Sequence, residues 1–339
     1  MTHQPEPLLP GVLAIDAGNS KTDVALIGAD GTVLGSARGG GFAPQKVGGA
    51  AAVAGLTPLV EEAAAAAGLS FRSGILTTHV SACLANADLP VEEEALRSAL
   101  ESHPWGATNT VANDTFGLLR AGTDGPRGIA VVCGAGINCV GLLPDGRTAR
   151  FPALGELTGD WGGGSGLAMN SMWHAVRAED GRGGPTGLAR AIAEHFGLPS
   201  TGAVAEAIHL GHLPYGRLHE IVRVLFAVAA AGDPVALELI DRQADEITRL
   251  AVVALGRLEL LEESTPVVLG GGVLASREPL LLDNVTARLA EAAPLAEPRV
   301  VVAPPVLGAA LLGLDHLGAG EAAQTRVREA YDPARRLAA

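Results

Sequence analysis

The sequence is poor in lysine and in aromatic residues, and it has no concentration of positive charge. Only two of its 24 basic residues are lysines, Lys21 and Lys46, and aromatic residues make up 3% of the 339 positions. The preference for arginine is typical of a GC-rich genome, so a single retained lysine does not by itself indicate function. The formal net charge is −13. Nucleic-acid binding, which needs a basic face, is therefore not expected.

Cysteine is scarce as well. Cys83, Cys133 and Cys139 lie in apolar runs without the spacing of metal ligands, which predicts buried, reduced thiols. The N-terminal residues lack the basic and apolar regions of a signal peptide. The longest uncharged apolar stretch, GIAVVCGAGINCVGLLP, is interrupted by glycines and Asn138 and so makes a poor membrane helix. We expect a cytoplasmic protein.

What the sequence does contain is a repeat. Residues 11–38 combine an apolar run, a polar turn, a second apolar run and the hairpin dipeptide Asp30-Gly31. Residues 128–146 repeat this order with a more glycine-rich turn and without the lysine. The spacing is 12 positions from Gly18 to Asp30 and 11 from Gly134 to Asp145. The repeat predicts two related domains facing each other, within a length that suits two domains.

Elsewhere, predicted strands alternate with predicted helices. Further strands are expected in SGILTTHVSAC, TNTVAND, TPVVL and PRVVVAPP, and helices follow or separate them. The last helix is expected in VLGAALLGLDHLG, followed by a charged, weakly structured tail over residues 320–339. This alternation predicts an α/β protein with mixed or parallel sheets.

The two polar turns are candidates for phosphate binding. Glycine permits the dihedral angles that let successive N–H groups converge on an anion. The first turn, residues 18–21, offers N–H groups, the Ser20 hydroxyl and the Lys21 cation, whereas residues 134–136 offer N–H groups alone. Each could also be only a tight turn. Neither matches the Walker loop or the Rossmann fingerprint.

Three aspartates each carry a functional and a structural interpretation. Asp16 ends the first strand, where its carboxylate could hold Mg²⁺ through water or close the turn. Asp114 lies between a strand and a helix, as a general base or as a helix cap. Asp160 lies in the loop TGDWGGGSG, where it could bind substrate hydroxyls or belong to a surface turn.

Two further features of the second half are ambiguous in the same way. Residues 270–272, three glycines after a strand, could leave room for a nucleotide or form a tight turn. Trp161 could pack on a sugar face, or in the core or a lid.

The order of these motifs carries a resemblance. IDAGNSKTD, VANDT, VVCGAGINC, GELTGDWGGGSG and VVLGGGV, spread over about residues 11–316, resemble the actin-like, sugar-kinase and Hsp70-type ATPase superfamily. Within it, the chain is similar to the BadF/BadG-type ATPase family that includes N-acetylglucosamine kinases. The resemblance implies two ribonuclease-H-like domains, 11–122 and 123–318, with ATP and Mg²⁺ in the cleft between them and a tail over 319–339.

The resemblance also implies roles for individual residues. Asp16 would bind the metal and Asp114 would be the catalytic base. Nucleotide binding is implied for Gly18, Asn19, Ser20, Lys21, Gly134, Ala135, Gly136, Gly270, Gly271 and Gly272. Substrate binding is implied for Asn113, Asp114, Asn138 and Asp160.

The chain departs from the family pattern at three places. The tryptophan of the glycine loop follows Asp160 instead of preceding it, and the segment GGGFAPQ lacks the sugar-binding asparagine expected there. Ala135 stands where a threonine is common. The first two departures concern the identity of the sugar, and the third removes one hydroxyl contact to phosphate.

The sequence therefore predicts an ATP-dependent kinase that phosphorylates a hydroxyl of an amino sugar such as N-acetylglucosamine, with the kinase a homodimer. The alternative is an ATPase switch that acts on a protein partner without a phosphorylated small-molecule product. Iron–sulfur relatives hold their cluster through cysteines between subunits, and no such cluster is expected from Cys83, Cys133 and Cys139.

Overall fold

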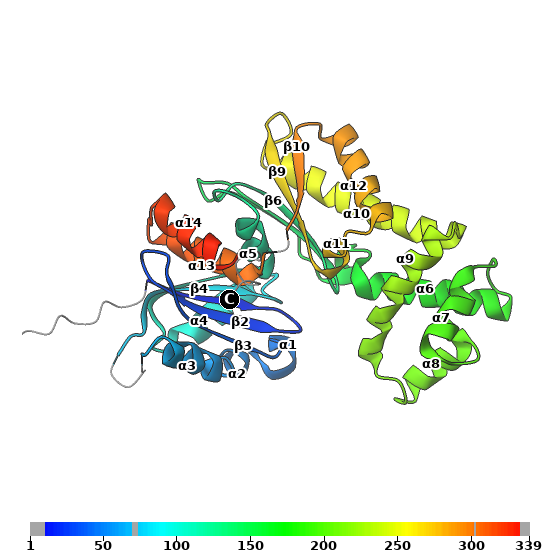
Figure 1. Ribbon diagram of the computed structural model, residues 1–339, viewed down its shortest axis with the longest axis horizontal. Helices are drawn as coiled ribbons and strands as arrows, with labels where there is room; N and C mark the ends of the chain where they lie inside the picture. Colours follow the sequence, from blue (N-terminus) through cyan, green and yellow to red (C-terminus); the bar gives the residue numbers. More distant parts are fainter. Residues whose placement is uncertain (1–10, 70–73, 302, 333–339) are drawn as a thin grey trace, which may run out of the picture. The chain divides into compact units, whose positions relative to one another are not determined.

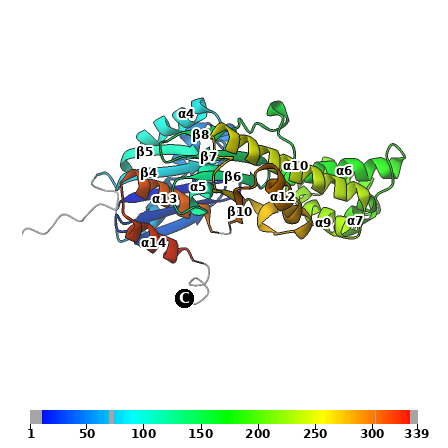
Figure 2. The same cartoon turned by 90° about the horizontal axis from the view of Figure 1, so that it is seen from above.

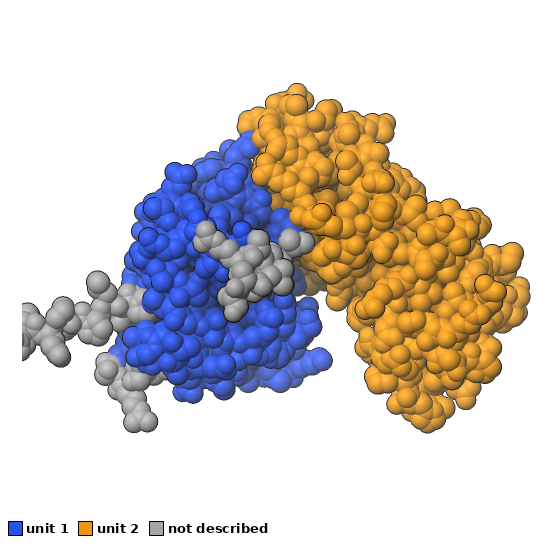
Figure 3. Space-filling view, viewed as in Figure 1, with its two compact units in different colours: residues 1–128, 140–148, 301–339 blue, residues 129–139, 149–300 orange. Residues whose placement is uncertain are grey.

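The computed structural model describes residues 11–69, 74–301 and 303–332, and the chain divides into two compact units. Unit 1 comprises residues 1–128, 140–148 and 301–339, and unit 2 comprises residues 129–139 and 149–300 (Figure 3). The chain thus leaves unit 1 and returns to it, whereas the predicted domains are continuous blocks. Their boundaries, 11–122 and 123–318, stay a prediction.

The first sheet contains the predicted N-terminal hairpin. Its strands are β1 (Val12–Ala17), β2 (Thr22–Ile27), β3 (Val33–Gly39), β4 (Thr77–Leu84) and β5 (Gly106–Asn113). They lie in the order β3-β2-β1-β4-β5, with antiparallel pairing among the first three and parallel pairing from β1 to β5. The carboxyl ends of β1, β4 and β5 therefore meet at one edge of the sheet.

The second sheet repeats this topology. Its strands are β6 (Gly128–Cys133), β7 (Ile137–Leu142), β8 (Thr148–Arg150), β9 (Thr265–Gly270) and β10 (Ala296–Val300). Their order is β10-β9-β6-β7-β8, so β6 to β10 take the places of β1 to β5 in turn. The internal repeat and the α/β class predicted from the sequence are confirmed.

The helices fill the connections between strands. Those of unit 1 are α1 (Pro44–Val47), α2 (Gly49–Ala54), α3 (Thr57–Ala66), α4 (Pro90–Glu101), α5 (Asp114–Ala121), α13 (Pro305–His316) and α14 (Glu321–Ala330). Those of unit 2 are α6 (Gly163–Asp180), α7 (Gly187–Phe196), α8 (Thr201–His209), α9 (Ile221–Ala230), α10 (Pro234–Arg257), α11 (Gly272–Ala275) and α12 (Pro279–Ala292), with 3-10 turns at Gly155–Thr158 and Tyr215–Glu220. None of the helices in the described ranges combines the length and apolar character needed to cross a bilayer.

Strand alternation gives the first sheet two apolar faces. Leu13 and Ile15 belong to the core shared with α2, α3 and α4, whereas Val12 and Ala14 belong to the core shared with α13. Helices α2 and α3 cover one face of the sheet and α13 the other (Figure 1). Asp16 continues the second series, so it lies on the face covered by α5 and α13.

The C-terminal residues correct one prediction. The tail was predicted to be weakly structured after a last helix, but α14 forms inside it and packs beside α13 (Figure 2). The helix contributes Val327 to the core that α13 shares with the first sheet, together with Tyr331 just beyond it. Its mean hydropathy is low because most of its residues face solvent, which is why composition alone indicated a loose tail.

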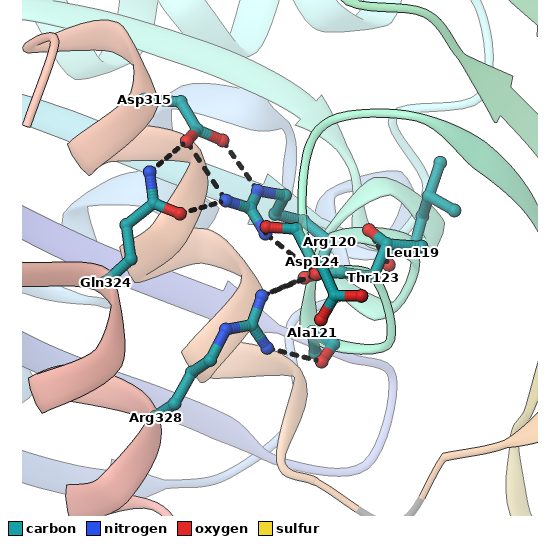
Figure 4. Close-up of polar contacts among 8 residues, drawn as sticks. All are labelled: Leu119, Arg120, Ala121, Thr123, Asp124, Asp315, Gln324 and Arg328. Carbon is teal, nitrogen blue, oxygen red and sulfur yellow. Dashed lines mark hydrogen bonds and ion pairs between the residues drawn. The ribbon is translucent and has the colours of Figure 1, made fainter. Parts of the chain in front are cut away.

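A buried arginine ties α5 to α13 and α14 (Figure 4). Arg120 is fully buried, and its Nε and Nη2 donate to the Asp315 carboxylate at 2.6 and 3.1 Å. Its Nη2 also donates to Gln324 Oε1 at 2.8 Å, and its Nη1 donates to the carbonyl of Thr123. Arg328 adds donors to carbonyls at the same helix end. Two cations thus stabilise the C-terminus of α5.

We predict that Arg120→Met destabilises unit 1 by about 3 kcal/mol, because Asp315 loses its cation and the carbonyls of Thr123 and Asp124 lose the Arg120 donor. Amide hydrogen exchange of α5 and α13 measures the loss. The matched control is Arg97→Met, since Arg97 forms exposed ion pairs on α4, and it should cost less than about 1 kcal/mol. Equal effects of the two variants would contradict a structural role for the buried network.

Candidate functional site

The first polar turn joins β1 to β2 and is closed by its own backbone. The Gly18 N–H donates to the Lys21 carbonyl at 2.9 Å, and the Gly18 carbonyl accepts from the Phe42 N–H at 2.9 Å. Asn19, Ser20 and Lys21 are exposed at the tip. The Gly18 N–H is therefore used within the hairpin, and the donors left for an anion are those of the three following residues.

Asp16 is buried opposite a second carboxylate. Asp16 is only 4% exposed, and Asp23 lies directly opposite it in the antiparallel pair of β1 and β2. Burial, with Asp114 and Asp23 as neighbouring negative charges, raises the pKa of Asp16 to about 8, against the opposing effect of Lys21 and Arg38. Arg38 binds Asp23 through Nε and Nη2 at 2.5 and 3.1 Å.

Asp23 and Arg38 were not predicted from the sequence as site residues. The signal was available in the hairpin itself, since a turn at residues 18–21 places Asp23 opposite Asp16. Arg38 then follows from the β2–β3 register, which pairs it with Asp23.

Asp114 is the first residue of α5 and is half-buried. The preceding residue, Asn113, is the N-cap, because its Oδ1 accepts from the Thr115 N–H at 3.0 Å. The capping position that the sequence left open for Asp114 is thus taken by Asn113. Burial raises the pKa of Asp114 to about 6, although backbone N–H groups of Thr115 and of Asp114 itself favour the ionised form.

The strand register brings Asp16 and Asp114 into one neighbourhood. Asp16 is paired with Cys83 on β4, and Cys83 with Ala112 on β5, two residues before Asp114. Burial raises the pKa of the Cys83 thiol, and Asp16 and Asp114 raise it further. Unit 1 therefore places the carboxyl groups of Asp16 and Asp114, both predicted from the sequence, at the carboxyl ends of its parallel strands.

The second turn lies against the N-terminus of α6. The Gly134 N–H donates to the Gly136 carbonyl at 2.9 Å, so this turn closes as the first one does. The carbonyls of Gly134 and Ala135 accept from the N–H groups of Gly164 and Ser165 at 2.7 and 2.9 Å. These bonds use two N–H groups at the N-terminus of α6. The positive end of the helix dipole lies beside the turn and favours an anion there.

Three glycine segments of unit 2 approach too closely for side chains. Gly271 has φ of +85°, and a Cβ there would lie 2.7 Å from the Gly134 nitrogen. Gly163 has φ of +69°, and its Cβ would lie 2.5–2.6 Å from backbone atoms of Gly136. The structure thus brings residues 134–136 and 162–164 together with residues 270–272, which lie more than a hundred positions further along the chain.

Asp160 is held in the loop before α6. Its Oδ2 accepts from the Thr158 hydroxyl at 2.6 Å, and its N–H donates to the Gly155 carbonyl. The next residue, Trp161, has the Arg242 guanidinium 4.2 Å from its ring centroid, so one face of the ring is already covered.

Helix α10 contacts the end of this loop through two side chains, Arg242 on Trp161 and Gln243 on Gly163. Gln243 is fully buried, and its Oε1 accepts from the Gly163 N–H at 2.8 Å. Arg242 and Gln243 were not predicted from the sequence, because a helical position carries no local sign of what it contacts.

Asn138, predicted to contact substrate, lies just after the second turn and its Oδ1 accepts from the Cys139 N–H at 2.7 Å.

The three thiols are free and buried, as predicted. Burial raises the pKa of Cys133 to about 12 and that of Cys139 above its ordinary range. Such thiols remain protonated and unreactive at neutral pH.

The donor set of unit 1 suits magnesium. Within the part of the chain that the structure describes, no three His, Cys, Asp or Glu side chains are grouped to hold a metal ion. Magnesium is commonly bound by one or two carboxylates, water and substrate phosphates. Asp16 supplies one buried carboxylate, and a cation beside it would offset the repulsion from Asp23 and Asp114.

We predict that Gly163→Ala weakens ATP binding about tenfold, because its Cβ would clash with the Gly136 backbone and force the two segments apart. The left-handed conformation of the alanine adds a strain of about 1–2 kcal/mol. Titration calorimetry with ATP measures the loss. Gly166→Ala is the matched control in the same helix, since its Cβ would meet nothing within 4 Å. Unchanged affinity in Gly163→Ala would remove the 162–164 segment from the nucleotide site.

The fold is shared with solved structures. A protein from Chromobacterium violaceum with the provisional name N-acetylglucosamine kinase superposes with a TM-score of 0.69 at 23% identity, covering 91% of this chain and all of the other. The chain therefore has the actin-like ATPase fold built from two ribonuclease-H-like halves. The prediction of an α/β protein with two ribonuclease-H-like halves is confirmed.

A family model gives the family directly. The model of the BadF/BadG/BcrA/BcrD ATPase family matches residues 13–313. The chain belongs to this family, as the order of motifs predicted.

Two curated relatives each match part of the chain. An N-acetyl-D-glucosamine kinase of Dictyostelium discoideum is 27% identical over 61% of this chain and 65% of its own length. An N-acetylmuramic acid/N-acetylglucosamine kinase of Clostridium acetobutylicum is 24% identical over 56% of this chain and 62% of its own length. The matches thus span less than two thirds of either relative.

Proposed function

We propose that this protein is an ATP-dependent kinase that transfers the γ-phosphoryl group of ATP to a hydroxyl of an amino sugar resembling N-acetylglucosamine. The observation that carries the proposal is Asp114, a half-buried carboxylate with a pKa of about 6 at the end of β5. It shares its strand edge with Asp16 and the 18–21 turn. Family membership and the two kinase relatives support the same reaction.

Asp114 is the general base in this proposal. A pKa of about 6 leaves the carboxylate ionised at neutral pH while keeping it basic enough to accept a hydroxyl proton. Asn113 fixes the first turn of α5, and its Nδ2 donates to Asp88 Oδ1 at 2.8 Å. The base is thereby oriented by the helix that carries it. Asn113, Asn138 and Asp160 are proposed to bind the sugar.

Nucleotide contacts are proposed in unit 1 at the 18–21 turn, and in unit 2 at the 134–136 turn and the 270–272 segment. Asn19, Ser20 and Lys21 supply donors and a cation to the phosphates, and Ala135 and Gly136 supply N–H groups. Gly270, Gly271 and Gly272 are proposed to bind adenosine, with open space beside Gly272, where a Cβ would meet nothing within 4 Å. In phosphoryl transfer such groups act mainly by positioning and by neutralising charge on the γ-phosphoryl oxygens.

Asp16 is proposed to hold Mg²⁺, directly or through a water ligand. The ion would neutralise phosphate charge. A cytoplasmic location and a homodimer stay predictions.

Release of ADP across a panel of sugars tests the function. We predict ADP release that depends on an N-acylated or free amino sugar and exceeds the rate with ATP alone by at least about a hundredfold. Mass spectrometry of the sugar identifies the phosphorylated product. Slow ADP release that no sugar changes would favour the alternative, an ATPase switch acting on a protein partner, for which the departure at GGGFAPQ is the motivating feature.

We predict that Asp114→Asn lowers kcat by about 10²–10⁴-fold, because an amide cannot accept the proton, while ATP binding is retained. In the wild type, kcat at saturating ATP and Mg²⁺ should fall below about pH 6, where Asp114 becomes protonated. Asp283→Asn, an exposed change on α12, is the control and should leave both quantities unchanged. Wild-type turnover in Asp114→Asn would eliminate the base role.

A further inference from the structure

Asn86 has a backbone conformation that its residue type adopts at a cost. It follows β4 with φ of +64°, in the left-handed region where glycine is the usual residue. Strain of this kind persists where surrounding contacts require it, and it clusters at functional sites. The contacts of Asn86 therefore indicate what the conformation serves.

The Asn86 side chain reaches the first phosphate turn. Its Nδ2 donates to Asn19 Oδ1 at 2.9 Å and, at 3.4 Å, to the carbonyl of Phe42. Phe42 is the residue whose N–H donates to the Gly18 carbonyl. A Cβ on Gly41 would lie 2.1 Å from the Asn19 carbonyl oxygen, so the segment before Phe42 lies directly against the turn.

These contacts fix which way the Asn19 amide points. The Phe42 carbonyl can only accept, so Asn86 must present its NH₂ group to that side. Asn19 must then present its Oδ1 to Asn86, and its own NH₂ group is directed away. In the described part of the chain this NH₂ group donates to no protein acceptor, and Asn19 is exposed at the tip of the turn.

The same loop is braced toward α5. Two residues after Asn86, Asp88 accepts a hydrogen bond from Asn113, the N-cap next to Asp114. Residues 86–88 thus contact both the turn at 18–21 and the N-cap residue of α5.

From this geometry we infer that Asn86 is a positioning residue that orients the Asn19 side chain so that its amide NH₂ donates to a phosphate oxygen of ATP. The inference rests on the proposed function for the nucleotide, but not on the identity of the acceptor. It adds a side-chain donor to a turn in which the Gly18 N–H is already used.

A double-mutant cycle tests the inference in the full-length protein, with calorimetric titration of a non-hydrolysable ATP analogue and Mg²⁺. Asn19→Ala should weaken binding about tenfold, since a hydrogen bond to a charged group is lost. Asn86→Gly should weaken it about fivefold, because Asn19 then loses its orientation. The double variant should bind no more weakly than Asn19→Ala, since the two residues act through one contact.

Thermal unfolding separates this role from a structural one. Glycine adopts the left-handed conformation without strain, so Asn86→Gly should melt close to the wild-type temperature while binding the analogue more weakly. Asn19→Asp should bind more weakly than Asn19→Ala, since its carboxylate still accepts from Asn86 but repels phosphate. Glu259→Gly, an exposed residue with φ of +60° in unit 2, is the matched control and should leave affinity unchanged.

Two results would overturn the inference. One is wild-type affinity in Asn86→Gly, and the other is a double variant whose loss is the product of the two single losses. Because no sugar is present in the titration, absence of sugar phosphorylation would reject the proposed kinase activity without affecting this cycle.

Discussion

The burial of Asp16 directly opposite Asp23 is the constraint on which the site of unit 1 depends. Two carboxylates that face each other across an antiparallel pair repel, and burial strengthens the repulsion. The hairpin offsets this cost with Arg38, which binds Asp23 through two hydrogen bonds, and with Lys21, whose Nζ lies 3.8 Å from Asp23. Asp16 itself keeps no such partner and has a raised pKa. A buried carboxylate left in this state is suited to a cation brought by a ligand.

The comparison of the two hairpins shows how the same topology was given different chemistry. The first turn closes over four residues, Gly18 to Lys21, and the second over three, Gly134 to Gly136. This one-residue difference accounts for the spacings of 12 and 11 positions in the sequence. Two residues before the first closing residue, Val132 takes the place of Asp16, and two residues after the last closing residue, Asn138 takes that of Asp23. The charged pair therefore occurs in one copy only, and the second copy offers backbone groups.

Much of the fold could be predicted from the sequence because its signals are local. Each hairpin carries an Asp-Gly turn between apolar runs, and its repetition predicted two related domains. The strands β6 to β10 repeat the order of β1 to β5. The signals failed where long-range packing decides. Helix α14 is polar apart from a few contacts such as Val327, so nothing nearby in the sequence marks it as part of the first core. The return of residues 301–339 to unit 1 is likewise a property of packing.

The residues of the candidate site also divide into those with a local sequence signal and those whose position depends on long-range packing. Asp16, Asp114 and the glycine segments have local signs, since each follows a strand, and the structure brings the groups of each unit together. Their supports have none. Asn86 and Gln243 are uncharged amides in a loop and on a helix, and their contacts lie 67 and 80 positions away along the chain.

These supports set how well the site is positioned. Strand ends fix where a group starts, but a turn or loop of small residues leaves its direction open. In unit 1 the direction of the turn is set by the strained Asn86, and in unit 2 the direction of the Asp160 loop is set by Gln243 and Arg242. Asn86, Gln243 and Arg242 contact residues of the turn and the loop, and they are not themselves proposed to touch ATP or the sugar. Their loss should therefore alter the geometry of binding more than it alters the fold. The residues that a motif search finds and those that give the motif its geometry are thus separate sets in this protein.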